Sequence, residues 1–482
     1  QEATDLRDAI WNTHFAEKFS SSTSGRPPST QYNKQFKILL LDLYVAWITD
    51  PELSIAVAMS KSAYGKNSRE SKIFITPKMI DIVHHAHKVG LIDMLIGSKA
   101  TGLRTLIRAS PELADEFEKL QLIIYALPYP DKKVIILRNK DPKNKKHSIE
   151  LPYKDSDFEP IVSMRQELNK YNRLLWRTFI DIPTLDRPVI EREVWNKKKQ
   201  KKETQLVHIS QNNKFVRRIF YRGSWELGGR FHGGFWQQIG SAWRKQIYIN
   251  NSPTVEQDYS GLHINLLYGL KCRQPSKEDP YELDHILLEF SKEEQRAVIK
   301  DLILMALNAD NLKSAINAFR AKQPTGSKAK RLKQKDLILL IDAFKDKHSL
   351  IKDYLFTGIG NALMNIDGRI SAKVIKHFTN KNIPVLTIHD SYITPYDFTG
   401  ELTKIMNDAI SDELNGFNIN IKQEAVGRDW LRACRNMVSL TEQHQHFPYT
   451  LLTHFKETKG YKRRMYYFNF CLEDYYKFLK EL

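Results

Sequence analysis

Two short acidic motifs carry the side chains best suited to chemistry. The first, VEQDYSGLH, spans residues 255–263, and the second, IPVLTIHDSY, spans residues 383–392. Each places an aspartate, Asp258 or Asp390, at the end of an apolar, strand-like run. Two carboxylates from separate strands can hold a pair of divalent ions, one activating an attacking hydroxyl and the other stabilising a leaving phosphate. Oxygen ligands favour Mg2+, with Mn2+ as a substitute. The pattern predicts nucleotidyl transfer with two Mg2+ ions.

The composition favours a polyanionic partner. The chain has 482 residues, enough for two to four domains, with 74 Lys and Arg against 56 Asp and Glu and a net charge of +18. No apolar run reaches membrane-spanning length, and no secretory signal is visible at the start. The three cysteines have no metal-ligand spacing and fit a reducing compartment. We expect DNA as a partner, no membrane association, and a cytoplasmic protein of bacterial, phage or mobile-element origin; the oligomeric state stays open.

Further candidate residues lie before and between the two acidic motifs. The segment LGGRF at 227–231 contains Arg230 and is followed by WQQI, which contains Gln238. Residues 296–308 have a helical pattern in which Arg296 and Lys300, four residues apart, share one face. Two cations on one helix face can hold a triphosphate, and a lysine can protonate a departing pyrophosphate.

The order of these segments resembles the polymerase domain of family A DNA polymerases and phage-type single-subunit RNA polymerases, over residues 206–435. The resemblance implies that Asp258 and Asp390 bind both metals, with a further ligand from the backbone carbonyl of Tyr259. It also implies a nucleotide site and a primer–template site on the residues that match the family's motifs. The implied nucleotide-binding residues are Arg296, Lys300, His263, Tyr259, Leu304 and Asn308, and the implied primer–template residues are Arg230, Gln238 and His389.

Several positions depart from the family pattern. His263 stands where the DNA polymerases usually have Glu, against the sugar of the incoming nucleotide, and an imidazole can hydrogen-bond a hydroxyl. Ser391 follows the RNA polymerase form. Leu304 and Asn308 stand where the family has an aromatic residue at one position or the other. Because Asp-Tyr-Ser is the DNA polymerase form of the first motif, we expect a compact DNA-directed DNA polymerase using dNTPs.

Other functions remain open on the sequence. The departures at His263 and Ser391 favour a primase or RNA polymerase that uses NTPs, and template-independent addition is a third possibility. From a different class, a DNA-binding replication initiator or regulator could keep a polymerase-like body without catalysis.

The fold class expected is α+β, a right-hand polymerase with an antiparallel palm sheet and helical fingers and thumb. A helix over 369–378 is expected to pack on the palm. Three basic segments, 140–146, 197–202 and 328–335, are predicted loops that could contact phosphates. The expected divisions begin with a flexible arm at 1–35, a winged-helix-like domain at 36–120, and a linker and thumb-like region at 121–205 with a helix at 161–179. Palm and fingers follow at 206–435, with the fingers at about 270–365, and an aromatic and basic extension occupies 436–482. We expect an amphipathic helix of this extension to pack on the body; the alternative is that its aromatic and basic side chains stack on bases or clamp the nucleic-acid backbone.

The N-terminal part resembles a winged-helix DNA-binding domain. Its pattern predicts a helix over 35–49, a helix over 78–89 that ends at Gly90, and a basic two-stranded ribbon. In this interpretation one helix enters a DNA groove and the ribbon forms the wing. The residues expected to contact DNA are Lys78, His84, His85 and Lys88 from the helix and Lys99, Arg104 and Arg108 from the wing.

Overall fold

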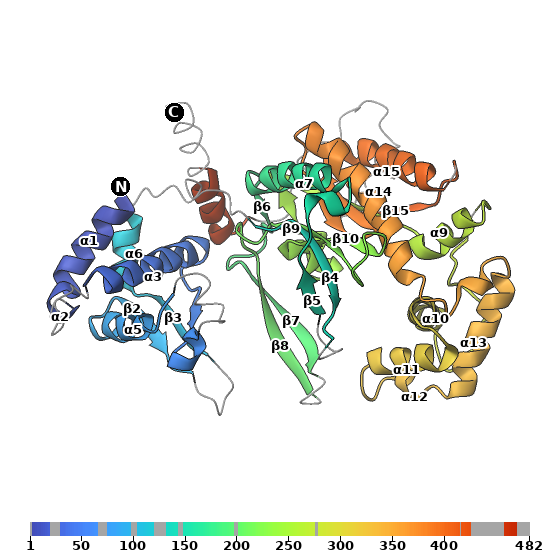
Figure 1. Ribbon diagram of the computed structural model, residues 1–482, viewed down its shortest axis with the longest axis horizontal. Coiled ribbons are helices and arrows are strands. Elements are labelled where there is room, and N and C mark those ends of the chain that lie inside the picture. Colours follow the sequence, from blue (N-terminus) through green and yellow to red (C-terminus); the bar gives the residue numbers. More distant parts are fainter. Residues whose placement is uncertain are drawn as a thin grey trace, which may run out of the picture. The chain divides into compact units, whose positions relative to one another are not determined.

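The computed structural model describes an α+β protein (Figure 1). The chain folds into two compact units. The first unit comprises Gln1–Pro130, Leu185–Pro188 and Glu457–Leu482, and the second comprises Asp131–Thr184 and Val189–Lys456. In the described part of the chain, no helix has the length and apolar character needed to cross a membrane. The described residues are 2–19, 29–65, 75–97, 104–119, 132–142, 148–196, 201–274, 278–414, 416–425 and 457–469.

The first unit packs helices on a small antiparallel sheet. The strands β1 (Ile55–Val57), β3 (Thr105–Ala109) and β2 (Ile92–Leu95) lie in that order. The helices are α1 (Glu2–His14), α2 (Ala16–Phe19), α3 (Ser29–Thr49), α5 (Lys78–Lys88) and α6 (Pro111–Glu118), with a short 3-10 turn at Lys61–Tyr64. Helix α3, the longest of this unit, contacts α1, α2 and α5 and also strands β1 and β3 of the sheet.

The predicted flexible arm over 1–35 is wrong for the residues described there. Trp11, Phe15 and Phe19 follow one another at four-residue spacing, which places them on one helical face, and all three are buried. Phe15 packs on Phe36 of α3 with ring centroids 4.3 Å apart. The arm is therefore part of the core of the first unit. Residues 20–28, which contain the Ser-rich stretch, lie outside the described residues.

The elements predicted for 36–120 are present, since α3, α5 and the β2–β3 ribbon occupy those positions. The DNA-facing orientation predicted for His85 is wrong. Its ring is buried, lies edge-on to Phe15 at 5.0 Å, and its Nε2 is 2.6 Å from the carbonyl oxygen of His14. Position 85 faces the core because it shares a helix face with Ile82 and Ala86.

The other residues predicted to contact DNA differ in how free their side chains are. His84, Lys88 and Arg104 are exposed. Lys78 is half-buried, hydrogen-bonds Gln31 and lies 4.8 Å from the ring centroid of Tyr32. Arg108 is paired with two carboxylates, those of Asp93 and Glu52. Lys99 lies outside the described residues. Whether this unit binds DNA stays a prediction.

A helix at 459–469 completes the first unit. Tyr467 packs on Trp47 with ring centroids 6.2 Å apart, and Arg464 Nη1 donates to the carbonyl oxygen of Asp186 at 2.7 Å. Within the predicted C-terminal extension, these residues form a helix that packs on the first unit. The remainder of 436–482 lies outside the described residues.

The second unit contains the sheet that carries both acidic motifs. Its strand order is β13-β14-β12-β11-β6, with β15 pairing with β12 as the sixth strand. The neighbouring sheet has the order β10-β9-β4-β5, and β7 and β8 form a separate two-stranded ribbon. The strands are β4 (Ile135–Lys140), β5 (Ser148–Leu151), β6 (Ile180–Asp181), β7 (Val189–Asn196), β8 (Lys201–His208), β9 (Val216–Phe220), β10 (Gly228–Gly233), β11 (Tyr248–Ile249), β12 (Ser252–Tyr259), β13 (Leu386–Ile388), β14 (Ser391–Pro395) and β15 (Ile421–Ala425).

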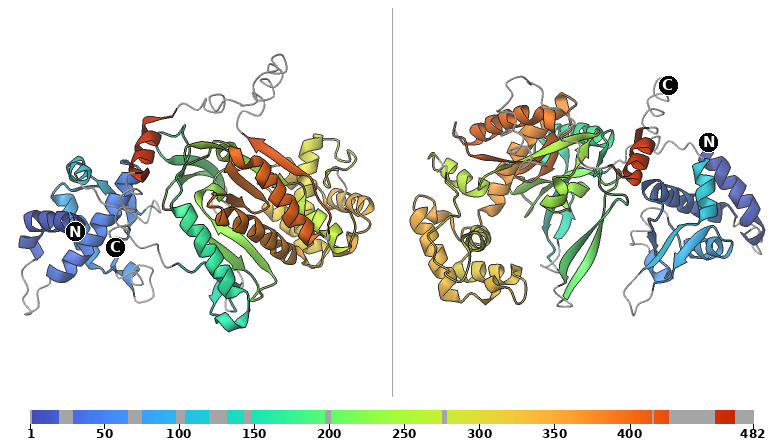
Figure 2. Two further views of the ribbon diagram at one scale, coloured as in Figure 1. Left: turned by 90° about the horizontal axis from the view of Figure 1, so that it is seen from above. Right: turned by 180° about the vertical axis from the view of Figure 1, so that it is seen from behind.

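The helices of the second unit form two groups. One group lies against the sheets and includes α7 (Ile161–Trp176), α14 (Gly360–Asn380) and α15 (Thr399–Glu413) (Figure 2). The other is a cluster within the predicted fingers region, to the right in Figure 1. It comprises α10 (Lys292–Asn308), α11 (Leu312–Lys322), α12 (Lys328–Arg331) and α13 (Gln334–Lys347), and α9 (Leu262–Leu270) follows β12.

Three predictions about this unit differ from the structure. In the linker and thumb-like region expected over 121–205, α7 is the one α-helix among the described residues, and it matches the predicted helix. Strands β4–β7 lie in the same range, and β4 and β6 belong to the two sheets. The expected boundary at residue 206 therefore cuts through one folded unit. The basic segment 328–335, expected to be a loop, forms α12 and the start of α13. Ser327 caps α12 by accepting from the backbone N–H of Lys330, and α13 begins with a capping box between Lys333 and Asp336. Residues 143–147 and 197–200, within or beside the other two basic segments, lie outside the described residues.

The predicted packing helix over 369–378 is confirmed as part of α14. Ile370, Val374 and Phe378 are buried. Where α14 crosses β10, a Cβ added to Gly368 would lie 2.2 Å from the carbonyl oxygen of Gly229, so only glycine permits this approach. The close packing places α14 directly beside the strand that carries Arg230.

Candidate active site

Strand pairing brings the two acidic motifs together. Strands β13 and β14 form a hairpin whose turn contains Asp390, and β14 pairs with β12 so that Asp258 lies opposite Ser391. The backbone N–H of Tyr259 donates to the carbonyl oxygen of Asp390 at 3.2 Å. The structure thus places Asp258 near the end of β12, beside the turn that contains Asp390.

The alternation of side chains along β12 separates a core face from a site face. Gln257 and Tyr259 point to the helices: Gln257 Nε2 donates to Thr403 Oγ1 at 2.8 Å, and the Tyr259 hydroxyl donates to the carbonyl oxygen of Met406 at 2.6 Å. Asp258 projects from the opposite face. A nucleotide-binding role for the Tyr259 side chain is therefore wrong, because that side chain is buried in the core, and only its backbone could reach a ligand.

The two carboxylates form an electrostatically strained pair. Burial, reinforced by the charge of Asp390, raises the pKa of Asp258 to about 7, while Lys300 and Lys422 oppose the rise. Neither carboxylate has a hydrogen-bond partner among the described residues. The nearby Glu256 is already occupied, since its oxygens accept from Arg244 at 3.0 Å and from Ser391 Oγ at 2.9 Å.

This donor set fits a divalent cation. A cation would relieve the repulsion between Asp258 and Asp390 and would stabilise their ionised forms, which burial disfavours. In the described part of the chain, no group of three or more His, Cys, Asp or Glu side chains is arranged to hold a metal ion. Further ligands would have to include backbone, water or phosphate oxygens, as is usual for Mg2+.

The raised pKa of Asp258 predicts a pH-dependent cost to stability. Between the ordinary pKa of 3.8 and about 7 the folded state keeps a proton that the unfolded state has lost, so the free energy of unfolding falls as pH rises through this window. In EDTA, Asp258→Asn should stabilise the protein by about 2 kcal/mol at pH 8, after allowing for partial exposure, and much less at pH 4. Urea unfolding at both pH values measures the difference; an equal effect at pH 4 and pH 8 would contradict the assignment.

The helix α10 presents the predicted triphosphate ligands. It begins with a capping box in which Ser291 and Glu294 bond each other's backbone N–H. Lys300 is exposed and interacts electrostatically with Asp258. Arg296 is held by Asp279: its Nε and Nη2 donate to Asp279 Oδ2 at 2.8 and 2.6 Å.

Leu304 and Asn308 lie on the same face of α10, two and three turns after Arg296. Leu304 is half-buried. Asn308 turns back on its own helix, where its Nδ2 donates to the carbonyl oxygen of Leu304 at 2.8 Å, and its side chain packs against Gly360. Contact between either residue and a nucleotide stays a prediction.

Arg230 belongs to a buried polar chain that joins three elements. Its Nε donates to Asp367 of α14, and its Nη2 donates to His263 Nε2 of α9 at 2.8 Å. Because arginine only donates, His263 must accept at Nε2 and carry its proton on Nδ1. Burial, with Arg230 and Lys300 nearby, lowers the pKa of His263 to about 3, so the ring is neutral. Primer–template contact by Arg230 stays a prediction.

Asp367 is a site residue that the sequence analysis missed. It is fully buried, and burial raises its pKa to about 7 although Arg230 opposes the rise. The signal was present: Asp367 occupies the apolar face of its helix, in register with Leu363, Ile370 and Val374. An acidic residue at a core position requires a cationic partner.

The two remaining predicted primer–template residues differ in position. His389, in the turn beside Asp390, has a left-handed backbone (φ 57°), and its ring lies 5.4 Å from that of His232. Burial and Arg230 lower its pKa to about 4. Gln238 is exposed. Its neighbour Gln237 donates to the carbonyl oxygen of Thr387 at 2.8 Å and ties this segment to the strand before His389.

Comparisons with known proteins add little to this site. No protein-family model matches the chain, and no curated protein matches it. Among solved structures the chain is similar to the POL domain of Pol1 from M. smegmatis, in complex with DNA primer-template and dNTP, at 10% identity and a TM-score of 0.28. The match covers 42% of this chain and 45% of that chain.

Proposed function

We propose that this protein is a template-directed nucleotidyltransferase, a compact DNA-directed DNA polymerase that uses two Mg2+ ions. One observation carries the proposal: the pairing of β12 with β14 sets Asp258 beside the turn that contains Asp390, and neither carboxylate has a hydrogen-bond partner among the described residues. Lys300 of α10 interacts electrostatically with Asp258. These three groups are the minimum that metal-assisted nucleotidyl transfer requires.

Each residue has a role in this proposal. Asp258 and Asp390 would hold the ions, which when bound activate the primer hydroxyl and neutralise charge on the phosphates. Lys300 and Arg296 would hold the triphosphate, and Lys300 would donate a proton to the departing pyrophosphate. Holding the reactants in line and neutralising charge supply most of the rate in phosphoryl transfer, so the rigid sheet beneath Asp258 matters as much as the charges.

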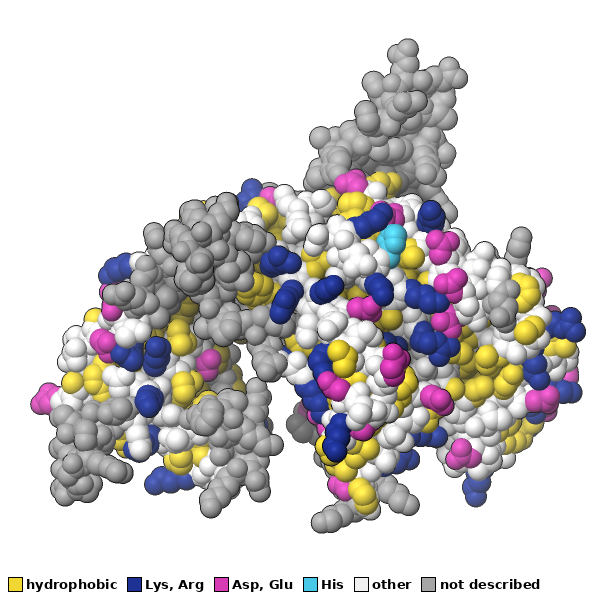
Figure 3. All heavy atoms as spheres, turned by 45° about the horizontal axis from the view of Figure 1, so that its top comes forward, with side chains coloured by type: hydrophobic (Ala, Val, Ile, Leu, Met, Phe, Trp, Pro, Cys, Tyr) yellow, Lys and Arg dark blue, Asp and Glu magenta, His cyan; other side chains and the backbone are white. Residues whose placement is uncertain are grey.

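The surface charge is compatible with a nucleic-acid partner. Lys and Arg side chains, dark blue in Figure 3, are spread over the visible face and are interspersed with acidic ones. Together with the net charge of +18, this distribution favours contacts to phosphate backbone, which weaken steeply as salt is added.

Incorporation of labelled nucleotides tests the proposal. dNTPs and NTPs are offered separately, with Mg2+ and either primed or unprimed DNA. Extension by dNTPs only from a primer supports a DNA polymerase, whereas NTP products without a primer support a primase or RNA polymerase. DNA binding that requires residues 36–108, with no product under any condition, would overturn the proposal and support the non-catalytic initiator or regulator.

The sugar preference is expected to depend on His263, and this position favours the NTP-using enzyme as a second candidate. Its neutral ring carries a proton on Nδ1, a buried nitrogen without a partner among the described residues. His263→Glu should lower the ratio of NTP to dNTP incorporation by about tenfold, because a carboxylate cannot donate to a 2′-hydroxyl. Ratios of kcat/KM for matched NTP and dNTP pairs measure the effect, with His263→Gln as the control that keeps a donor. An unchanged ratio would place sugar selection elsewhere.

A further inference from the structure

Strand β15 places one more cation on the face that carries Asp258. In the β12–β15 pair, Asp258 lies directly opposite Lys422. Opposed residues of an antiparallel pair project to the same face of the sheet. Lys422 is 57% exposed, so its ammonium is available to a ligand. Lys422 comes from the sheet and Lys300 from α10, and both side chains are exposed.

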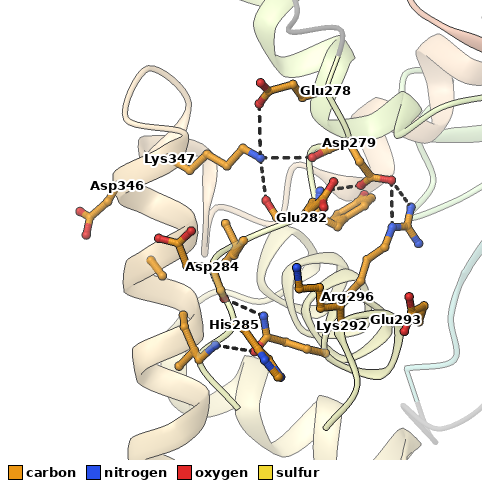
Figure 4. Close-up of a pocket in the computed structure, with 15 residues that line it drawn as sticks. Glu278, Asp279, Glu282, Asp284, His285, Lys292, Glu293, Arg296, Asp346 and Lys347 are labelled. Atoms are coloured by element: carbon orange, nitrogen blue, oxygen red, sulfur yellow. Dashed lines mark hydrogen bonds and ion pairs between the residues drawn. The ribbon is translucent and has the colours of Figure 1, made fainter. Parts of the chain in front are cut away.

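An acidic residue joins this lysine to the predicted triphosphate site. Asp279 Oδ2 accepts from Arg296 Nη2 at 2.6 Å and lies 3.9 Å from Lys422 Nζ. The other oxygen of Asp279 accepts from the backbone N–H of Tyr281 at 2.9 Å. The Asp279 carboxylate therefore pairs with two cations from different elements, Arg296 of α10 and Lys422 of β15. Figure 4 shows the pair of Arg296 and Asp279.

The segment that carries Asp279 is held firmly. Lys347 of α13 donates to the carbonyl oxygens of Asp279 and Glu282, and His348 Nε2 lies 2.8 Å from the carbonyl oxygen of Pro280. Pro280 also packs directly over Gly261, where a Cβ would lie 2.4 Å from the proline ring. The position of Asp279 is fixed by these contacts on two sides, so it can orient the two cations that it attracts.

The charge balance here suits an anionic ligand. Arg296 and Lys422 place two positive charges at the one carboxylate of Asp279. Lys300 lies one helical turn after Arg296 on the same face of α10. Only the Nε and one Nη2 proton of Arg296 are directed at Asp279, which leaves its remaining donors for a ligand. A triphosphate carries several negative charges and needs such donors beyond those neutralised by metal ions.

We propose that Lys422 is a third cation of the triphosphate site, facing the phosphates from the sheet while Arg296 and Lys300 face them from α10. This inference rests on the function proposed above. Asp279 is a positioning residue that keeps Arg296 and Lys422 pointed at a common ligand. The phosphates would lie between β15 and α10, which defines the side from which a nucleotide approaches Asp258.

Lys422→Ala, Lys422→Arg and the control Lys404→Ala test this inference. Lys404 is an exposed lysine on α15, which covers the opposite face of the sheet. Lys422→Ala should raise the nucleotide KM about tenfold with a smaller change in kcat, Lys422→Arg should recover most of the affinity, and Lys404→Ala should match wild type. Calorimetric titration with inorganic tripolyphosphate in EDTA should show the same order without metal ions or turnover.

The outcomes separate the two proposals. A wild type that incorporates no nucleotide overturns the proposed function, whereas Lys422-dependent binding of tripolyphosphate by that same protein would still support the cation site. An active wild type in which Lys422→Ala has the KM and the tripolyphosphate affinity of Lys404→Ala overturns the role of Lys422. A fall in kcat alone, with unchanged affinity for tripolyphosphate, also contradicts it.

Discussion

Replacing Asp258 or Asp390 with asparagine is expected to reduce nucleotide incorporation at least about a thousandfold, with primer–template affinity changed by less than about threefold. Asparagine keeps the shape of the side chain but removes the charge that would hold a divalent ion. DNA affinity should persist because it depends on cations elsewhere on the protein. Single-turnover extension of a labelled primer measures the rate, and fluorescence anisotropy of the same primer–template measures binding.

Asp408→Asn is the matched control for this prediction. Asp408 is an exposed aspartate on α15, the helix that covers the face of the sheet opposite Asp258. It should extend primers at the wild-type rate. If Asp258→Asn were as active as Asp408→Asn, the assignment of Asp258 as a metal ligand would be wrong.

Removing Asp367 or Arg230 is expected to destabilise the protein by about 3–5 kcal/mol, because each substitution leaves the other charge buried without its partner. Asp367 is fully buried and the Arg230 side chain is 15% exposed. Urea unfolding of Asp367→Ala, Arg230→Ala and the double variant should give a double-variant cost well below the sum of the single costs. The measurements belong at pH 8, above the raised pKa of about 7 of Asp367.

The pair formed by Arg369 and Glu413 gives the comparison. Arg369 is 48% exposed and its Nη2 lies 2.7 Å from Glu413 Oε2. Because water screens this pair, Arg369→Ala should cost less than about 1 kcal/mol. Equal costs at Asp367 and Arg369, or additive costs for Asp367 and Arg230, would show that the buried chain does not hold the site together.

The parts of the fold set by local pattern were predictable. The apolar runs before Asp258 and Asp390 are strands, and the periodic segments at 296–308 and 369–378 are helices, because hydrophobic spacing over such lengths leaves few alternatives. The ribbon β7–β8 was not predicted. Its strands are rich in charged residues, and they are formed by pairing with each other rather than by a buried apolar face.

The missed site residues are those defined by tertiary contacts. Asp367 acquires its role only when Gly368 lets α14 approach β10 and Arg230. Lys422 lies far from Asp258 in sequence, and only the register of β15 on β12 brings the two together. In a single sequence each reads as an ordinary charged residue on a helix or a strand, because register and close packing are long-range properties.

Template dependence tests the central claim most directly. Wild-type protein with Mg2+ is given one primer annealed to four DNA templates that differ only in the first unpaired base, and each of the four dNTPs is supplied singly. The proposed function predicts extension by the complementary nucleotide on each template, and none when Asp258→Asn replaces the wild type. The same nucleotide preference on all four templates, or no extension on any, would contradict a template-directed nucleotidyltransferase.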